Sequence, residues 1–283
     1  MKSKLRSVLC VILSAALVLC IFSTAGAAEA KRYVVLGDSI AFGLGLLNPG
    51  EAVYGKIVAD TNGYEYENYA IPGHTTANMM QRMENKTVKN AIANADIISI
   101  SIGGNNFLMD DLAGILFEGI VKEDYTHIDE IADKYYDDLD TIIRTIRELN
   151  AHTAILLQTI YNPQTSYIGE VYKIGAERIN GKMKEYAANN PGEIIIVDVA
   201  ARLTDSGTDF AEDRVHPSAA GNEKIAEEVL KTLYENGLGT ETEPVINTPA
   251  IDLKGTAILP VVMSFYGSFL HMLSLIRGCF TKF

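Results

Sequence analysis

Five short strand-like segments alternate with longer stretches of helical character, and this alternation constrains the fold of the chain most strongly. Four of the segments are rich in apolar residues, and the one at 64–69 alternates aromatic and acidic residues. The segments have the length and residue content of strands, and they cover residues 33–36, 64–69, 96–102, 154–160 and 193–199. The helical stretches cover residues 51–60, 75–95, 128–150, 166–189 and 218–234. Strands that alternate with helices form a parallel sheet covered on both faces. The pattern therefore predicts an α/β fold, a three-layer α/β/α sandwich with a five-stranded parallel sheet over residues 31–236, with flavodoxin-like strand order as the natural expectation.

Residues 1–30 have the character of a secretory signal peptide. Lys2, Lys4 and Arg6 precede an apolar run at residues 8–22, and patterns of small residues typical of a cleavage site follow at 25–27 and 28–30. We therefore expect an exported protein, secreted or held at the cell surface. The formal net charge is −12. Such an acidic chain is not expected to bind nucleic acid, because that affinity depends on neutralising phosphates.

Two segments follow the predicted domain. Residues 237–255 contain a Thr-Glu-Thr-Glu-Pro sequence and little apolar periodicity, so we predict a linker. The hydrophobic tail, residues 256–283, holds a mostly apolar run at 257–276 that is followed by Arg277 and Lys282. Its length favours a membrane-spanning anchor. Two alternatives stay open, an amphipathic helix lying in the membrane plane and a helix docked back on the domain.

Ser39 directly follows the first predicted strand, in the turn Gly-Asp-Ser. Ligands of open α/β sheets bind at the carboxyl edge of the sheet, so we expect the Ser39 hydroxyl at the lip of a crevice. A serine is a poor nucleophile unless a base and an orienting acid stand behind it. Asp213, three residues before His216, offers both groups. His216 is the expected base and Asp213 the group that orients its ring.

Two further turns carry groups that suit acyl transfer. Gly73 follows the second predicted strand with an unobstructed backbone N–H, and Asn105 follows the third with a side-chain amide. Together with the N–H of Ser39, these donors are expected to form an oxyanion hole. Each signal is weak alone, because Gly-Asp-Ser is a common turn and Asp-x-x-His also occurs at helix starts. Because these signals occur in order at the ends of successive strands, together they indicate a site for acyl transfer.

Four sequence blocks, taken together, resemble the SGNH hydrolases, also called GDSL esterases and lipases. The blocks are Gly37 to Ile40, the block that holds Gly73, Gly103 to Asn106, and Asp213 to Pro217. The resemblance runs over residues 33–233. It implies the three-layer fold, a triad of Ser39, Asp213 and His216, and an oxyanion hole of Ser39, Gly73 and Asn105. It also implies that no metal and no cofactor is needed. Two positions depart from the family pattern, Ile40 in place of Leu and Asn106 where Asp is commoner.

The chain is thus expected to be an exported serine hydrolase that cleaves carboxylic esters, of lipids or of short acyl groups, through a Ser39 acyl-enzyme. One alternative is an O-acetyl esterase that acts on cell-wall or other polysaccharide. The other is a tethered binding protein without turnover, which a complete triad argues against. Residues 107–127 are less regular, and we expect either a lid over the crevice or a helical insertion packed elsewhere.

Overall fold

The computed structural model describes residues 29–163 and 167–280. The predicted signal peptide lies outside the described residues, apart from Glu29 and Ala30. The chain divides into two compact units, residues 1–30 and residues 31–283. The description that follows concerns the second unit.

Five strands form a single parallel sheet in the order β2-β1-β3-β4-β5. Their bounds are β1 Arg32–Gly37, β2 Glu65–Asn68, β3 Ile97–Ser101, β4 Ala154–Gln158 and β5 Ile195–Val197. In the register, Tyr33 of β1 is opposite Tyr66 of β2 and Ile97 of β3. The predicted parallel sheet and its flavodoxin-like order are confirmed. The chain winds outward in both directions from β1, so the ends of β1 and β3 flank the switch point where ligands bind in such folds.

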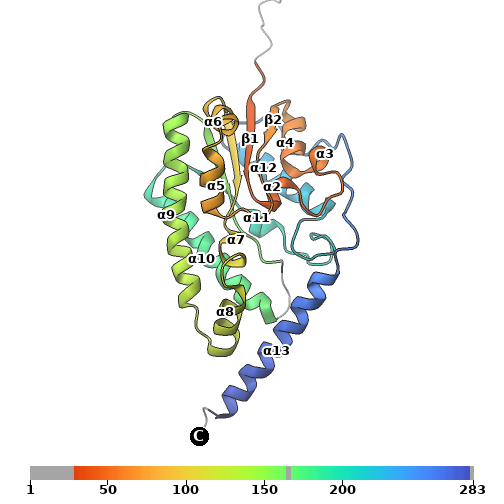
Figure 1. Ribbon diagram of the computed structural model, residues 1–283. Coiled ribbons are helices and arrows are strands. Elements are labelled where there is room, and N and C mark those ends of the chain that lie inside the picture. Colours follow the sequence, from red (N-terminus) through yellow and green to blue (C-terminus); the bar gives the residue numbers. More distant parts are fainter. Residues whose placement is uncertain (1–28, 164–166, 281–283) are drawn as a thin grey trace, which may run out of the picture. The chain divides into compact units, whose positions relative to one another are not determined.

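Helices cover both faces of the sheet, which makes the three layers (Figure 1). One face carries α5 (Thr76–Met83), α6 (Lys86–Ala93), α9 (Thr126–Leu149) and α10 (Tyr167–Asn189), and the other carries α4 (Tyr54–Asn62) and α12 (Ala219–Glu235). Side chains of β1 alternate between the two cores: Val34 and Leu36 lie in one, Tyr33 and Val35 in the other. Period-two alternation with apolar residues on both faces is what a doubly covered strand requires.

Several predicted elements differ in detail from the observed ones. The predicted helix at 75–95 is two helices, because the Asn85 side chain accepts the N–H of Thr87 and starts α6. The predicted helix at 51–60 is α3 (Pro49–Ala52) followed by α4, with extended Val53 between them. Residues 107–127 hold most of a helical insertion, made of α7 (Gly104–Leu108), α8 (Leu112–Phe117) and the π-helix η1 (Glu118–Lys122).

Residues 237–255 run back across the body of the unit. The Leu47 N–H donates to the Ile251 carbonyl at 2.7 Å, and the Leu253 N–H donates to the Gly45 carbonyl at 2.8 Å. The Asp252 carboxylate accepts the Ala219 N–H at 2.7 Å. The segment therefore joins the loop after α2 (Ser39–Phe42) to the start of α12.

The hydrophobic tail forms α13 (Ile258–Phe280), which packs against α8, η1 and α10. None of the helices described in the structure has the length and apolar content that crossing a bilayer requires. The membrane span expected at 257–276 is therefore not found. Ser268, His271 and Ser274 dilute the apolar side chains of this stretch, and Leu270 is buried in the larger core. The observed packing of α13 against α8, η1 and α10 corresponds to the third arrangement considered from the sequence, a helix docked back on the domain.

Candidate active site

The turn that carries Ser39 is made by a glycine and a capping carboxylate. Gly37 ends β1 with φ +138°, and a Cβ at this position would stand 2.0 Å from the Ser101 carbonyl oxygen. Only glycine lets the ends of β1 and β3 approach so closely. The Asp38 carboxylate then accepts the Ile40 N–H at 3.0 Å and begins α2. Ser39 is thereby held at the first position of α2, at the carboxyl edge of the sheet.

Asp213 and His216 reach Ser39 from a loop before α12. Nε2 of His216 lies 2.9 Å from Oγ of Ser39, and Nδ1 of His216 lies 2.6 Å from Oδ2 of Asp213. The other carboxylate oxygen of Asp213 accepts the backbone N–H groups of Val215 and His216, each at 3.0 Å. The structure thus brings the three residues into one hydrogen-bonded series, although Ser39 and His216 are 177 positions apart.

The hydrogen bonds around Asp213 keep its carboxyl ionised. Burial alone would raise its pKa, but the ring and backbone N–H groups of His216 and the N–H of Val215 outweigh burial and hold the pKa below its usual value. An ionised carboxylate can only accept a hydrogen bond, so Nδ1 carries the ring proton and donates a hydrogen bond to Asp213. The neutral imidazole then presents an unprotonated Nε2 to Ser39. This tautomer is the one that can accept the hydroxyl proton.

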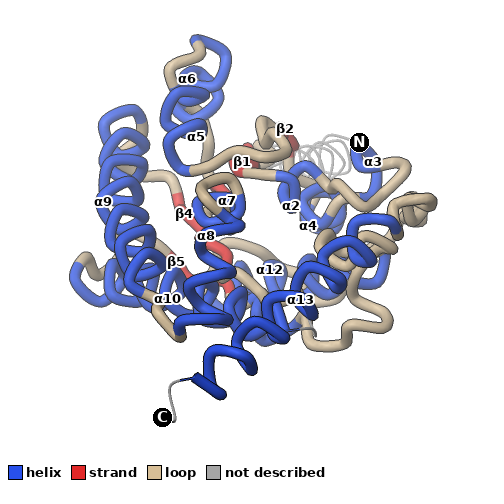
Figure 2. Tube along the Cα trace, turned by 60° about the horizontal axis from the view of Figure 1, so that its bottom comes forward, coloured by secondary structure: helices blue, strands red, loops and turns tan. Residues whose placement is uncertain are grey.

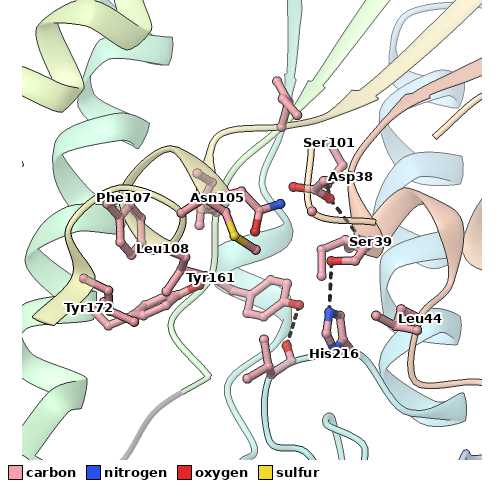
Figure 3. A pocket seen from close by; sticks show the side chains of 18 of the residues that line it. Asp38, Ser39, Leu44, Ser101, Asn105, Phe107, Leu108, Tyr161, Tyr172 and His216 are labelled. Atoms are coloured by element: carbon pink, nitrogen blue, oxygen red, sulfur yellow. Dashed lines mark hydrogen bonds between the residues drawn. The ribbon is translucent and has the colours of Figure 1, made fainter. Parts of the chain in front are cut away.

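Two residues that the sequence interpretation did not single out shape the His216 loop. The Tyr161 hydroxyl donates to the Val215 carbonyl at 2.8 Å (Figure 3). Gly45 has φ +108°, and a Cβ there would stand 2.8 Å from the Pro217 carbonyl oxygen. The sequence held a signal for both, because Tyr161 follows the fourth strand and Gly45 lies in the glycine-containing segment after Ser39.

Gly73 and Asn105 line the same cavity as Ser39. Gly73 has φ +81°, a backbone conformation that favours glycine. The Asn105 side-chain amide donates one hydrogen bond to the His74 carbonyl at 3.0 Å. An amide group has two N–H donors, so this bond orients the side chain and leaves a second N–H for another acceptor.

Asn106, one of the two departures from the family pattern, holds the turn that carries Asn105. Its side-chain oxygen accepts the Thr76 N–H at 3.1 Å, and its amide donates to the Thr76 hydroxyl at 2.7 Å. The Thr76 hydroxyl in turn donates to the buried Asp138 carboxylate at 2.5 Å. The residue therefore ties α7 to the start of α5 with two hydrogen bonds.

Asp38 is a buried carboxyl beside the site, with 5% of its surface exposed, and the sequence interpretation treated it only as a turn former. Burial raises its pKa to about 6, although the Ile40 N–H, the His216 ring and the Ser101 hydroxyl oppose the rise. A carboxyl in an unfolded chain loses its proton near pH 4. The folded protein therefore binds more protons than the unfolded chain between about pH 4 and pH 6.

We predict that Asp38 makes the protein less stable as the pH rises through this window. The free energy of unfolding should fall by roughly 3 kcal/mol from this group alone, because ionisation in the folded state is opposed by burial. Asp38→Asn keeps an oxygen that can accept the Ile40 N–H but cannot ionise. Relative to the wild type, it should gain stability from pH 4 to pH 6 and level off above. Urea unfolding at unit pH steps measures this, with exposed Asp137→Asn as the matched control; a pH-independent difference for Asp38→Asn would contradict the prediction.

An apolar cavity of about 320 Å³ extends from Ser39. Figure 3 shows Phe107, Leu108 and Tyr172 on its side away from His216. The apolar wall comes mainly from the insertion and from the start of α10, with Phe107, Leu108, Leu112, Ile115, Leu116, Ile168, Val171 and Tyr172. The volume lies within the range of small-molecule sites. The 107–127 insertion therefore builds the wall of the cavity next to the serine.

The fold and the site together define the class of protein: the chain is a carboxylic ester hydrolase. The model of the GDSL-like Lipase/Acylhydrolase family matches residues 35–224, which include all three residues of the hydrogen-bonded series. The chain belongs to this family.

The chain is also similar to individual proteins. The chain is 27% identical over 227 residues to the protein YpmR of Bacillus subtilis (strain 168), a match that covers 75% of this chain and 86% of YpmR. The crystal structure of the lipase Lip_vut3 from a goat rumen metagenome has a TM-score of 0.60 at 20% identity, over 72% of this chain and 98% of that one. A family 3 carbohydrate esterase of Clostridium thermocellum has a TM-score of 0.52 at 19% identity, over 75% and 100%. At these identities the two structures share the fold.

Proposed function

We propose that the protein hydrolyses carboxylic esters of apolar acyl chains through a covalent intermediate on Ser39. The observation that carries the proposal is the juxtaposition of the Ser39–His216–Asp213 series with the apolar cavity. A serine hydroxyl next to a polar, open cleft suits a small acetyl group on a glycan. An apolar cavity beside the hydroxyl suits an alkyl chain, because burying it removes apolar surface from water.

In the first half-reaction, the Ser39 oxygen attacks the ester carbonyl while His216 Nε2 takes the hydroxyl proton. The ionised Asp213 stabilises the imidazolium that forms. The tetrahedral intermediate collapses when its bond to the alcohol oxygen breaks, and the imidazolium gives its proton to the departing alcohol. In the second half, His216 takes a proton from water as the water attacks the acyl carbonyl. The carboxylic acid leaves and the proton returns to Ser39.

The oxyanion that forms in both halves needs hydrogen-bond donors on its side of the carbonyl. We propose the backbone N–H groups of Ser39 and Gly73 and the Asn105 amide for this role. Their position on the cavity that holds the serine supports it, as does the bond from Asn105 to the His74 carbonyl, which orients the amide before substrate arrives. Donors oriented in advance stabilise charge without reorganising during the reaction.

Asn105→Ala tests this role. The variant should lose about a hundredfold in kcat with little change in KM, because the lost hydrogen bond is strongest to the charged transition state. Steady-state kinetics with a short nitrophenyl ester measures both constants. Asn94→Ala, an exposed asparagine at the end of α6, serves as the control. A rise in KM at unchanged kcat would assign Asn105 to ground-state binding instead.

Nitrophenyl esters from acetyl to palmitoyl test the substrate class. We expect kcat/KM to rise with chain length until the cavity is filled. Strong preference for acetyl, together with acetate release from acetylated glycans, would favour the polysaccharide O-acetyl esterase. The Clostridium thermocellum family 3 carbohydrate esterase, which shares the fold, is an esterase of carbohydrates. Absence of turnover and of labelling by a fluorophosphonate would favour the tethered binding protein.

We further propose that the protein is exported and that residues 1–30 are removed. The basic start, the apolar run and the small residues at 25–30 support this. Amino-terminal sequencing of the protein from a producing cell tests it. A mature start near Lys31 is expected, and an intact Met1 in the cytoplasmic fraction would contradict export.

A further inference from the structure

The helix α13 contacts the segments that form the wall of the cavity. The Tyr266 hydroxyl donates to the Ala113 carbonyl of α8 at 3.4 Å, and Arg277 donates to the Val121 carbonyl of η1. Leu270 has only 2% of its surface exposed and lies in the core that includes α8 and α10. Figure 2 shows α13 running past α8 and α10. The tail therefore lies behind the wall, on the side away from the cavity.

One contact joins α13 directly to a side chain that lines the cavity. Ile168, near the start of α10, is 2% exposed and lines the cavity. A Cβ built on Gly267 of α13 would stand 2.9 Å from Cγ1 and 3.3 Å from Cδ1 of Ile168. A heavy atom at 2.9 Å overlaps the Ile168 side chain, because apolar carbons pack at about 3.5 to 4.0 Å. Gly267 thus leaves the space that the Ile168 side chain occupies beside the cavity.

We propose that α13 sets the depth of the acyl-chain cavity by holding Ile168 back through Gly267. Gly267 is then a positioning residue for acyl-chain length, although it does not touch substrate. The inference rests on the proposed function, in which the cavity holds the acyl chain. It explains why glycine occurs in the middle of a helix, where it costs about 1 kcal/mol relative to alanine.

Gly267→Ala adds one methyl group at this contact and favours the helix, so the variant should fold. The methyl group should push Ile168 into the cavity, since an isoleucine side chain can rotate and the backbone of α10 is packed against α9. We expect kcat/KM for palmitoyl and octanoyl esters to fall about tenfold, the scale on which an apolar pocket discriminates one methylene group. Turnover of the acetyl ester should stay within twofold.

A double-mutant cycle separates this effect from a general disturbance. Ile168→Ala removes both carbons that the new methyl group would meet, so Gly267→Ala should cause no further loss of long-chain turnover in the Ile168→Ala background. Phe269→Ala, an exposed side chain on the same helix (52%), is the matched control and should keep the wild-type profile.

The outcomes distinguish the two proposals. A wild type that prefers acetyl over every longer ester would overturn the proposed function and this inference with it. A wild type that prefers long chains, with a Gly267→Ala variant of unchanged profile, would overturn the inference alone. An equal loss for acetyl and palmitoyl esters, or a loss that persists in the Ile168→Ala background, would also overturn the inference.

Discussion

Ser39→Ala is expected to abolish ester hydrolysis, with a fall in kcat of roughly 10⁴- to 10⁶-fold. The variant lacks the oxygen that would attack the carbonyl, while His216 and Asp213 keep their places. The serine is small and its hydroxyl bonds to the His216 ring, so the loss of this one bond should cost only about 1 kcal/mol of stability. Ser39→Ala should therefore lose almost all of its activity while it keeps nearly the stability of the wild type.

Covalent labelling with a fluorophosphonate gives the second readout. The wild type should label once, and Ser39→Ala should not label at all. Ser101→Ala is the matched control, because Ser101 ends the neighbouring strand β3 and lines the same cavity; this variant should still label. Labelling retained in Ser39→Ala would move the nucleophile to another residue.

Asp213→Asn should lower kcat by about 10⁴-fold although the side chain keeps its shape. The asparagine oxygen can still accept the Val215 and His216 N–H groups, which leaves its NH₂ group facing Nδ1 of the ring. An NH₂ group donates, so Nδ1 must accept and the ring proton must sit on Nε2. Nε2 then points a proton at Ser39 and cannot take the hydroxyl proton.

Kinetics of a short ester and a circular dichroism spectrum measure this effect. Fluorophosphonate labelling of Asp213→Asn should be slow but present, because the Ser39 hydroxyl remains. Glu212→Gln removes a charge one residue away, where the carboxylate accepts the Gly255 N–H, and should leave kcat within a few-fold. A kcat within tenfold of the wild type for Asp213→Asn would refute the role of the carboxylate in setting the tautomer.

Most strands and helices could be predicted from the sequence, because the spacing of apolar residues and the positions of turn residues are local properties of the chain. The predicted bounds of the five strands agree with the observed ones to within two residues at each end. Helix 75–95 was predicted as a single helix because its composition is helical throughout. The break depends on one hydrogen bond, from the Thr87 N–H to the Asn85 side chain, and composition does not show such a bond.

The tail shows the opposite limit. The length of its mostly apolar run favours a membrane span in the sequence, but hydropathy along a sequence does not show what an apolar side chain contacts. In the structure, Leu270 and Gly267 meet α10 and the core, and the described helices include none that could cross a bilayer. A docked helix could not be predicted from the sequence, because the docking depends on where tertiary packing places α8 and α10.

The sequence by itself was enough to predict the layered fold and the candidate site residues. These are Ser39, Gly73, Asn105, Asp213 and His216. Strand ends can be found locally, and parallel strands place their carboxyl ends on a common edge. Only the tertiary structure decided that Nε2 of His216 lies 2.9 Å from Oγ of Ser39, and that an apolar cavity extends from that point. Such distances depend on long-range packing. Gly37 lets β1 approach β3, and the Tyr161 hydroxyl donates to the Val215 carbonyl in the His216 loop. The cavity is lined by residues of α2, α7, α8 and α10, which come from separate parts of the chain.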